Sequence, residues 1–171
     1  MTHDLLSHVR QCAAYNRGAN ERLYAACAQL SDADRRRNLG SFFGSIHGTL
    51  NHIIVGDRIW MGRFAGETVP STGLDAILYD DFAALAGARV AEDRRIEAFF
   101  AGLDAAFFDR PLTYVNNQGR RFSDPATVIV PHFFNHQTHH RGQVHAMITQ
   151  LDRGLAPVLD MHRVLIPNPK P

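Results

Sequence analysis

The segment NHQTHHRGQVH, residues 135–145, contains four of the ten histidines of this 171-residue chain. His136 and His140 lie four residues apart, a spacing that places two imidazoles on one side of an α-helix, close enough to bind one metal ion. A chain so rich in histidine also produces such a pair by chance, and a core histidine is usually a hydrogen-bonded packing residue. The direction of the two rings on their helix therefore matters.

The apolar residues around the pair indicate that both rings point inward. At about 100° per residue, an apolar stripe falls within about 40° of His140, and so does His136. The stripe consists of Ile129, Phe133, Val144, Met147 and Leu151. His132 and Gln143 lie at the edges of the stripe, and His139 lies further out. His145 is predicted to face solvent. An unpaired buried polar group costs about 1–3 kcal/mol, and one metal ion would satisfy both inward rings.

A third ligand is available in the segment TLNHIIVGDRIW. Taken alone, His52 fits a structural or surface residue; taken with the pair, it completes a three-histidine site. The small residues Thr49 and Gly56 are expected to leave room for an ion beside it. Three neutral imidazoles leave an open coordination position on a divalent ion. Imidazole ligands suit Zn, Ni, Cu or Fe(II), so the identity of the metal stays open.

Four other polar residues each allow two interpretations. Asp57 either accepts a hydrogen bond from a ligand histidine or pairs with an arginine. Arg141, just off the inward face, either forms a structural ion pair or binds substrate. Asn16 and Asn51 either bond to ring nitrogens and line the pocket, or serve helix packing.

Apolar seams predict the helices that carry these residues. The first seam covers residues 5–30, with alternating spacings of four and three, typical of a bundle helix. The second covers residues 43–64 and ends at Gly66. A third helix is expected at about residues 81–108, closed by Pro111.

A small hairpin is expected before the last helix. Residues 112–122 alternate β-formers with the turn residues Asn116, Asn117 and Gly119. Ser123 or Asp124 would then cap the last helix, with Pro125 in its first turn. Pro131 should kink that helix or mark a second start. The tail after residue 154 is expected to be irregular and to pack over the bundle.

Composition narrows the function classes. Hydrophobic residues make up 45% and charged ones 20%, typical of one globular domain. The net charge of +1 gives no electrostatic argument for nucleic acid, and no apolar stretch is long enough for a membrane span. Cys12 and Cys27 would lie about 22 Å apart along one helix, too far for a disulfide. Reduced thiols, without a signal-peptide pattern, indicate the cytoplasm.

Three segments resemble the DinB/YfiT family of small bacterial candidate metalloenzymes. They are YNRGANERLYAACAQLS, FFGSIHGTLNHIIVGDRIWMGRFAG and FFNHQTHHRGQVHAMITQL. The resemblance implies one domain over residues 1–171, an all-α four-helix bundle with a crossover connection, commonly a homodimer. It also implies one divalent metal held by His52, His136 and His140. Gly18 stands where similar sequences have a bulky aromatic residue, which leaves the packing of the first helix open.

The resemblance further implies a metal-dependent enzyme acting on a small molecule. The candidate reactions are transfer that uses a low-molecular-weight thiol, bound as its thiolate, and hydrolysis. The alternative is a non-catalytic metal or small-ligand binding module for stress response. The open coordination position favours the enzyme, whereas the lack of an obvious Asp or Glu general base near the histidines favours the module. No catalytic residue is predicted.

Overall fold

The computed structural model describes residues 4–69, 72–116 and 118–166. Its four long helices are α1 (Leu5–Ala28), α3 (Ile46–Ala65), α4 (Phe82–Ala101) and α5 (Ala126–Leu151). Short helical segments are α2 (Asp32–Arg36), η1 (Ala105–Asp109), η2 (Arg153–Leu155) and α6 (Met161–Leu165). Strands β1 (Pro111–Val115) and β2 (Arg121–Pro125) form an antiparallel hairpin before α5. No helix in these described ranges is long and apolar enough to cross a membrane.

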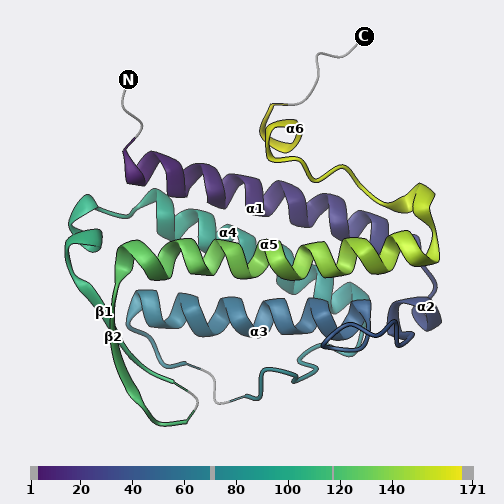
Figure 1. Ribbon diagram of the computed structural model, residues 1–171, viewed down its shortest axis with the longest axis horizontal. Coiled ribbons are helices and arrows are strands. Elements are labelled where there is room, and N and C mark those ends of the chain that lie inside the picture. Colours follow the sequence, from purple (N-terminus) through teal and green to yellow (C-terminus); the bar gives the residue numbers. More distant parts are fainter. Residues whose placement is uncertain (1–3, 70–71, 117, 167–171) are drawn as a thin grey trace.

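The long helices form a four-helix bundle in which α1 and α3 both pack against α4 and α5. Figure 1 shows that α1 and α5 run in one direction and α3 and α4 in the other. The connection from α3 to α4 therefore returns along the whole length of the bundle. This is the crossover that the family resemblance implied, and the all-α bundle and the hairpin are confirmed as well.

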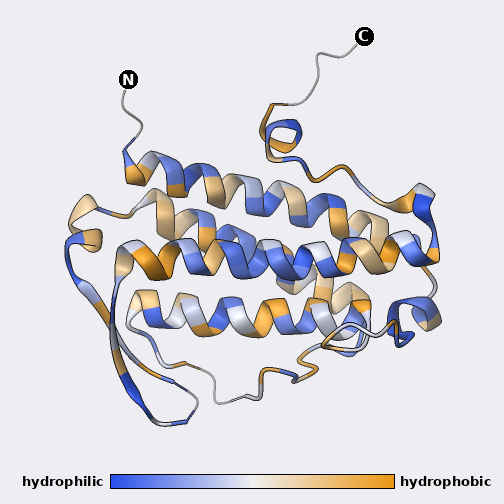
Figure 2. Cartoon of the chain, in the orientation of Figure 1, coloured by the Kyte–Doolittle hydropathy of each residue, from blue (hydrophilic) through white to orange (hydrophobic). Residues whose placement is uncertain are grey.

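Two apolar clusters fill the bundle, one toward each end. The first contains Leu23, Leu50, Ile53, Leu85, Val144 and Met147, among others. The second contains Val9, Met61, Phe64, Phe100 and Phe133, among others. Figure 2 shows the same division on α5, which is apolar near both ends and hydrophilic in the middle. The helix thus brings polar side chains into the centre of the bundle while apolar residues on both sides hold it in place.

The helix ends differ from the sequence predictions in several places. The third helix ends at Ala101 instead of residue 108, because Asp104 caps a separate 3-10 turn with its side chain. Ser123 and Asp124 do not cap α5; both belong to β2, and Pro125 precedes the helix without a side-chain cap. Of the two alternatives for Pro131, a kink or a second start, the second start is wrong, since α5 continues through this proline. Of the predicted turn residues, Asn117 lies outside the described ranges.

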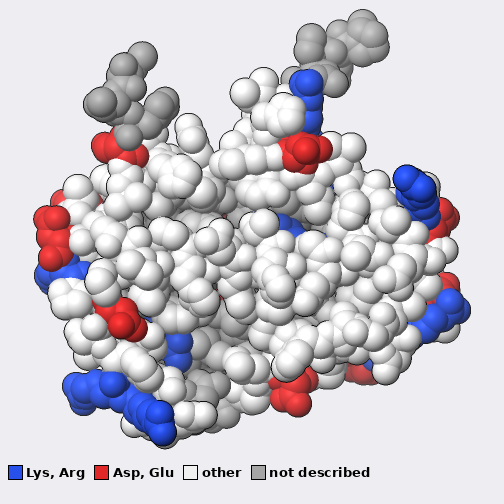
Figure 3. All heavy atoms as spheres, viewed as in Figure 1, with Lys and Arg blue, Asp and Glu red and all other residues white. Residues whose placement is uncertain are grey.

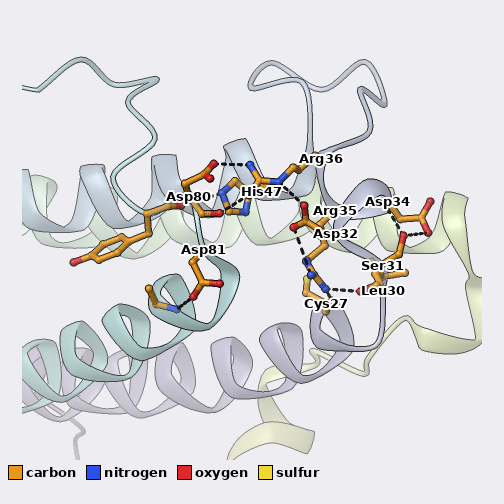
Figure 4. A network of polar contacts seen from close by, with 12 residues as sticks. Cys27, Leu30, Ser31, Asp32, Asp34, Arg35, Arg36, His47, Asp80 and Asp81 are labelled. Carbon is orange, nitrogen blue, oxygen red and sulfur yellow. Dashed lines mark hydrogen bonds and ion pairs between the residues drawn. The ribbon is translucent and has the colours of Figure 1, made fainter.

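The short helix α2, which the sequence did not predict, holds the end of the connection between α3 and α4. Ser31 caps α2 with its side chain. Arg36 bridges Asp32 on α2 at 2.9 Å and Asp80 at 2.8 Å, just before α4 (Figure 4). On α3, the His47 ring nitrogen Nε2 lies 2.9 Å from the carbonyl oxygen of Tyr79. These contacts fix the end of the long connection against the bundle.

The tail explains the unusual glycine of the first helix. Helix α6 packs on α1, and a Cβ atom at Gly18 would lie 2.6 Å from Cγ1 of Val164. A larger side chain at this position would displace α6. The tail therefore occupies the space that a larger side chain at Gly18 would need, and it contains short helical turns as well as irregular chain.

Candidate metal centre

Three histidine rings from two helices meet in the polar centre of the bundle. Nε2 of His52 on α3 lies 3.1 Å from Nε2 of His136 and 3.1 Å from Nε2 of His140, both on α5. The ligand atoms of all three lie within 4.8 Å of one another. Zn–N bonds of about 2.0–2.1 Å in a tetrahedral site separate two ligand nitrogens by about 3.3 Å. The spacing of these rings is therefore that of a metal site.

Two of the rings have a hydrogen-bond acceptor at Nδ1. The proton of each ring therefore lies on Nδ1, and the lone pair on Nε2 is free to bind a metal ion. Nδ1 of His52 lies 2.7 Å from the carbonyl oxygen of Leu74, which can only accept, so Nδ1 carries the proton. Nδ1 of His140 lies 2.8 Å from Oε1 of Gln143 in the same arrangement. Metal-binding histidines usually have such an acceptor on the second nitrogen. Two bare Nε2 atoms 3.1 Å apart repel each other unless a proton or a metal ion lies between them.

Burial disfavours a proton between these Nε2 atoms, because it disfavours the charged form of the rings. His52 and His140 are buried, with 4% and 7% of their surface exposed. Burial lowers the pKa of both rings below the usual value. Burial, with the neighbouring imidazoles of His140 and His52, lowers the pKa of His136 to about 3. The three rings are therefore neutral at physiological pH, the state in which imidazole binds metals.

Small and aromatic neighbours shape the site. A Cβ atom at Gly56 would lie 2.8 Å from Cε1 of His136, so this glycine makes room for a ligand ring and not, as expected, for the ion. The hydroxyl of Thr49 donates to the carbonyl of Ser45 at 2.8 Å. The ring of Phe43 stacks on that of His52 with 3.8 Å between centroids. Phe43 precedes α3, although its place in the apolar seam predicted a helical residue.

A buried ionic network lies beside the site, and it explains Asp57. The carboxylate of Asp57 pairs with Arg89 at 2.5 Å and accepts from Gln137 at 2.7 Å. Arg89 also pairs with Asp93 at 3.0 Å. Burial acts to lower the pKa of Arg89, but the two carboxylates outweigh it and raise that pKa. Of the two interpretations of Asp57, the arginine partner is correct, and Gln137 links the network to the helix turn of His136.

The other polar residues serve packing. Asn16 accepts from Arg141 and donates to Asp93 at 3.0 Å. Arg141 forms no ion pair in the described structure; its guanidinium instead lies 5.2 Å from the ring centroid of Tyr15. Asn51 donates to and accepts from the backbone of Tyr79 at 3.1 and 2.9 Å, which holds the long connection in place.

His145 does not face solvent as predicted. It is half-buried, and its Nε2 lies 3.1 Å from the carbonyl oxygen of Pro157 in the tail. It still points away from the triad, so its exclusion from the metal site agrees with the structure. His139 is exposed and bonds to Gln143 at 3.2 Å, so Gln143 contacts histidines on both sides.

The family assignment follows from comparison with known proteins. The family model described as "DinB family" matches residues 1–160. The chain belongs to the DinB family. It is 26% identical over 153 residues to "Protein DinB" of Bacillus subtilis (strain 168), an alignment covering 84% of this chain and 86% of that protein. No solved structure gives a significant match.

A cleft of about 370 Å³ begins at the triad of this DinB-family chain. His52 and His136 form part of its wall, and the groove between α3 and α5 continues past Trp60 and His132 to Arg63 and the hairpin. The rings of Trp60 and His132 meet edge to face at 5.4 Å. His132, which the sequence placed only at the edge of the apolar stripe, is exposed in this cleft. The sequence analysis did not predict Trp60 or Arg63 as cleft residues. They follow Gly56 by four and seven positions, a spacing that places all three on one face of the helix and that could have indicated them.

A larger cavity, of about 1040 Å³, lies elsewhere, between α1 and the tail helix α6. It is lined by Arg10, Gln11, Met161 and Leu165, among others, and by none of the three histidines. Size therefore does not identify the functional site. The smaller cleft is the candidate binding site because it contains the convergent nitrogens.

Proposed function

We propose that this protein binds one divalent metal ion, such as Zn, Ni or Fe(II), through Nε2 of His52, His136 and His140. The observation that carries the proposal is the convergence of three neutral rings, with Nδ1 of two of them bound to acceptors. His136 lacks such an acceptor in the described structure, and its Nδ1 is buried. A site of three neutral ligands and a divalent ion keeps a net charge near +2, which favours an anion at the open position.

We propose further that the site acts on a small molecule in the adjoining cleft. A divalent ion with an open position lowers the pKa of a bound water or thiol, and so supplies a nucleophile at neutral pH. The candidate reactions are thiol-dependent transfer and hydrolysis. His52 and His136 orient the reacting end of the cleft, and the exposed ring of His132, one helix turn from His136, is placed to hold or move a proton there.

The second candidate is a non-catalytic metal or small-ligand binding module. One observation favours it: the residues that line the cleft in the described chain include no Asp or Glu to serve as a general base. Replacing His132 by glutamine separates the two candidates once a substrate is found. A binding module would keep its ligand affinity and have no turnover to lose.

The test uses cobalt in place of the native metal. A thiolate ligand gives cobalt an intense charge-transfer band in the near ultraviolet. We expect the band when a small thiol such as 2-mercaptoethanol is added to the cobalt protein, and no band in His52→Ala if that variant loses the metal. The His145→Ala variant is the matched control, because this histidine bonds to the tail. An unchanged spectrum in the metal-loaded wild type would contradict the thiol proposal.

We also propose that the protein is a cytoplasmic homodimer. Its two cysteines are free, as expected in a reducing compartment. Figure 3 shows that charged side chains are sparse over the centre of the face formed by α1, α5 and α3. The phenylalanine content is no support, because most phenylalanines pack inside the chain in one cluster. Sedimentation that gives a mass near 19 kDa at micromolar concentration would contradict the dimer.

A further inference from the structure

The end of the cleft that lies away from the triad contains a fixed cation. Arg63 on α3 is held between two aromatic rings, with Cζ 4.5 Å from the centroid of Trp60 and 4.6 Å from that of Tyr114. Its Nη2 donates to the carbonyl oxygen of Val115 at 3.3 Å. Aromatic faces and a backbone acceptor fix the guanidinium plane, so little side-chain entropy remains to be lost when a ligand binds.

This guanidinium has donor capacity left. Nε of Arg63 is buried and has no hydrogen-bond partner among the described residues. The acidic groups nearby are already occupied, since Glu67 pairs with Arg95 at 2.6 Å and Asp124 accepts from Tyr114 at 2.8 Å. Burial also lowers the pKa of Arg63, which shows that the cation has lost hydration. An unpaired and partly desolvated guanidinium gains most from a carboxylate or phosphate.

The cation and the triad stand at opposite ends of one cleft. Arg63 follows His52 by eleven positions on α3, which corresponds to about 16 Å along the helix axis. Helical side chains lean toward the N-terminus, and the contact of Arg63 with Trp60 agrees with that direction. The stretch between them is walled by Ile59, Trp60 and His132. A ligand that reaches both ends must be elongated, with a middle part that tolerates apolar and aromatic walls.

We propose that the cleft takes an elongated small molecule with a metal-binding group at one end and a carboxylate or similar anionic group at the other, which Arg63 binds. This inference rests on the proposed function, because it names the ligand class of the same site. Arg63 then selects the substrate by charge and sets the distance from its anionic group to the triad. The anion binds to Arg63 whether or not the triad holds a metal.

The experiment uses two matched probes, 8-mercaptooctanoate and 8-mercaptooctanol, which differ only in the charge at one end. Two readouts report the two ends of the cleft. The cobalt charge-transfer band reports thiolate at the triad, and the fluorescence of Trp60, the single tryptophan of the chain, reports the Arg63 end. We expect the carboxylate probe to bind at least about tenfold more tightly than the alcohol, as for a hydrogen bond to a charged group.

Variants assign the preference to Arg63. Arg63→Gln should abolish the preference for the carboxylate and leave the cobalt spectrum of the ligand-free protein unchanged. Arg63→Lys should restore part of the preference for the carboxylate probe. That partial recovery would show that the loss in Arg63→Gln comes from the missing charge and not from misfolding. Arg94→Gln, which removes an exposed arginine of α4 outside the cleft, should keep the full preference.

The outcomes separate this inference from the proposed function. Equal affinity of both probes in the wild type, or a preference that persists in Arg63→Gln, would overturn the inference while the cobalt band still supported a thiol-binding metal site. The absence of the band with both probes would instead contradict the thiol proposal. In that case a fluorescence change of Trp60 that requires both the carboxylate and Arg63 would still support the anion site, and the lack of one would overturn it.

Discussion

Replacing Gly56 by alanine should weaken metal binding without destabilising the helix that carries it. A Cβ atom there would lie 2.8 Å from Cε1 of His136, against 3.4 Å or more in an ordinary contact, so the ring must move by about 0.6 Å. Ligand positions in metal sites tolerate only about 0.2 Å. Disturbing the orientation of a ligand typically costs about 10–100-fold in metal affinity, and we expect a loss in that range for Gly56→Ala.

The same substitution should leave the metal-free protein at least as stable as the wild type. Alanine is favoured over glycine inside a helix by about 1 kcal/mol, and without metal the ring of His136 can turn away at little cost. Gly142→Ala on α5 is the matched control, because a Cβ atom at this exposed glycine meets nothing within 4 Å. Gly142→Ala should gain the stability that the higher helix propensity of alanine provides, and it should keep the wild-type metal affinity.

The assay for Gly56→Ala combines two titrations. Competition with a chromophoric chelator gives the zinc affinity of each variant, and urea unfolding in the presence of EDTA gives the stability of the metal-free form. Wild-type zinc affinity in Gly56→Ala would refute the reasoning, since it would mean that the observed position of the His136 ring is not the one that binds metal. A large loss of stability in EDTA would also refute it, because the ring would then be fixed by packing.

The remaining predictions concern charge, pH and the tail. Arg89→Met should cost about 3–5 kcal/mol in urea unfolding, since it leaves two buried carboxylates without their arginine partner; a cost below about 1 kcal/mol would mean that these ion pairs do not stabilise the fold. The metal-free protein should lose stability as pH falls below about 6.5, where the unfolded chain binds protons that the folded His136, with its lowered pKa, does not; a flat profile by thermal unfolding between pH 7 and 5 would contradict this. His145→Ala should keep the wild-type metal content, and loss of metal on elemental analysis would place this ring in the site. Gly18→Leu should release the tail at Val164, seen as faster proteolysis there, without changing metal content; unchanged proteolysis would show that the tail does not depend on this contact.

The triad could be predicted from the sequence because it depends on local geometry. The spacing of His136 and His140 and the phase of the apolar residues around them place both rings inward whatever the rest of the fold does. His52 required one further step, the search for a partner on another apolar seam. The four-helix bundle followed in the same way from periodicity together with the family resemblance.

What the sequence did not predict depends on contacts between distant segments. Arg89 had no pattern that would link it to Asp57, 32 residues earlier in the chain. The acceptor for His52 is a backbone carbonyl, that of Leu74, and any residue type could provide it. The capping error before α5 has a related cause, since Asp124 is engaged by Tyr114 across the hairpin and is not free to cap a helix.

The most direct test of the metal site is elemental analysis of untagged protein purified without added metal, since a tag column can load nickel artificially. The proposal predicts one divalent metal ion per chain, and none in the double variant His136→Ala/His140→Ala, whose helical content should match the wild type by circular dichroism. One tightly bound ion per chain in that folded double variant, or no metal in the wild type even after dialysis against zinc, would contradict it.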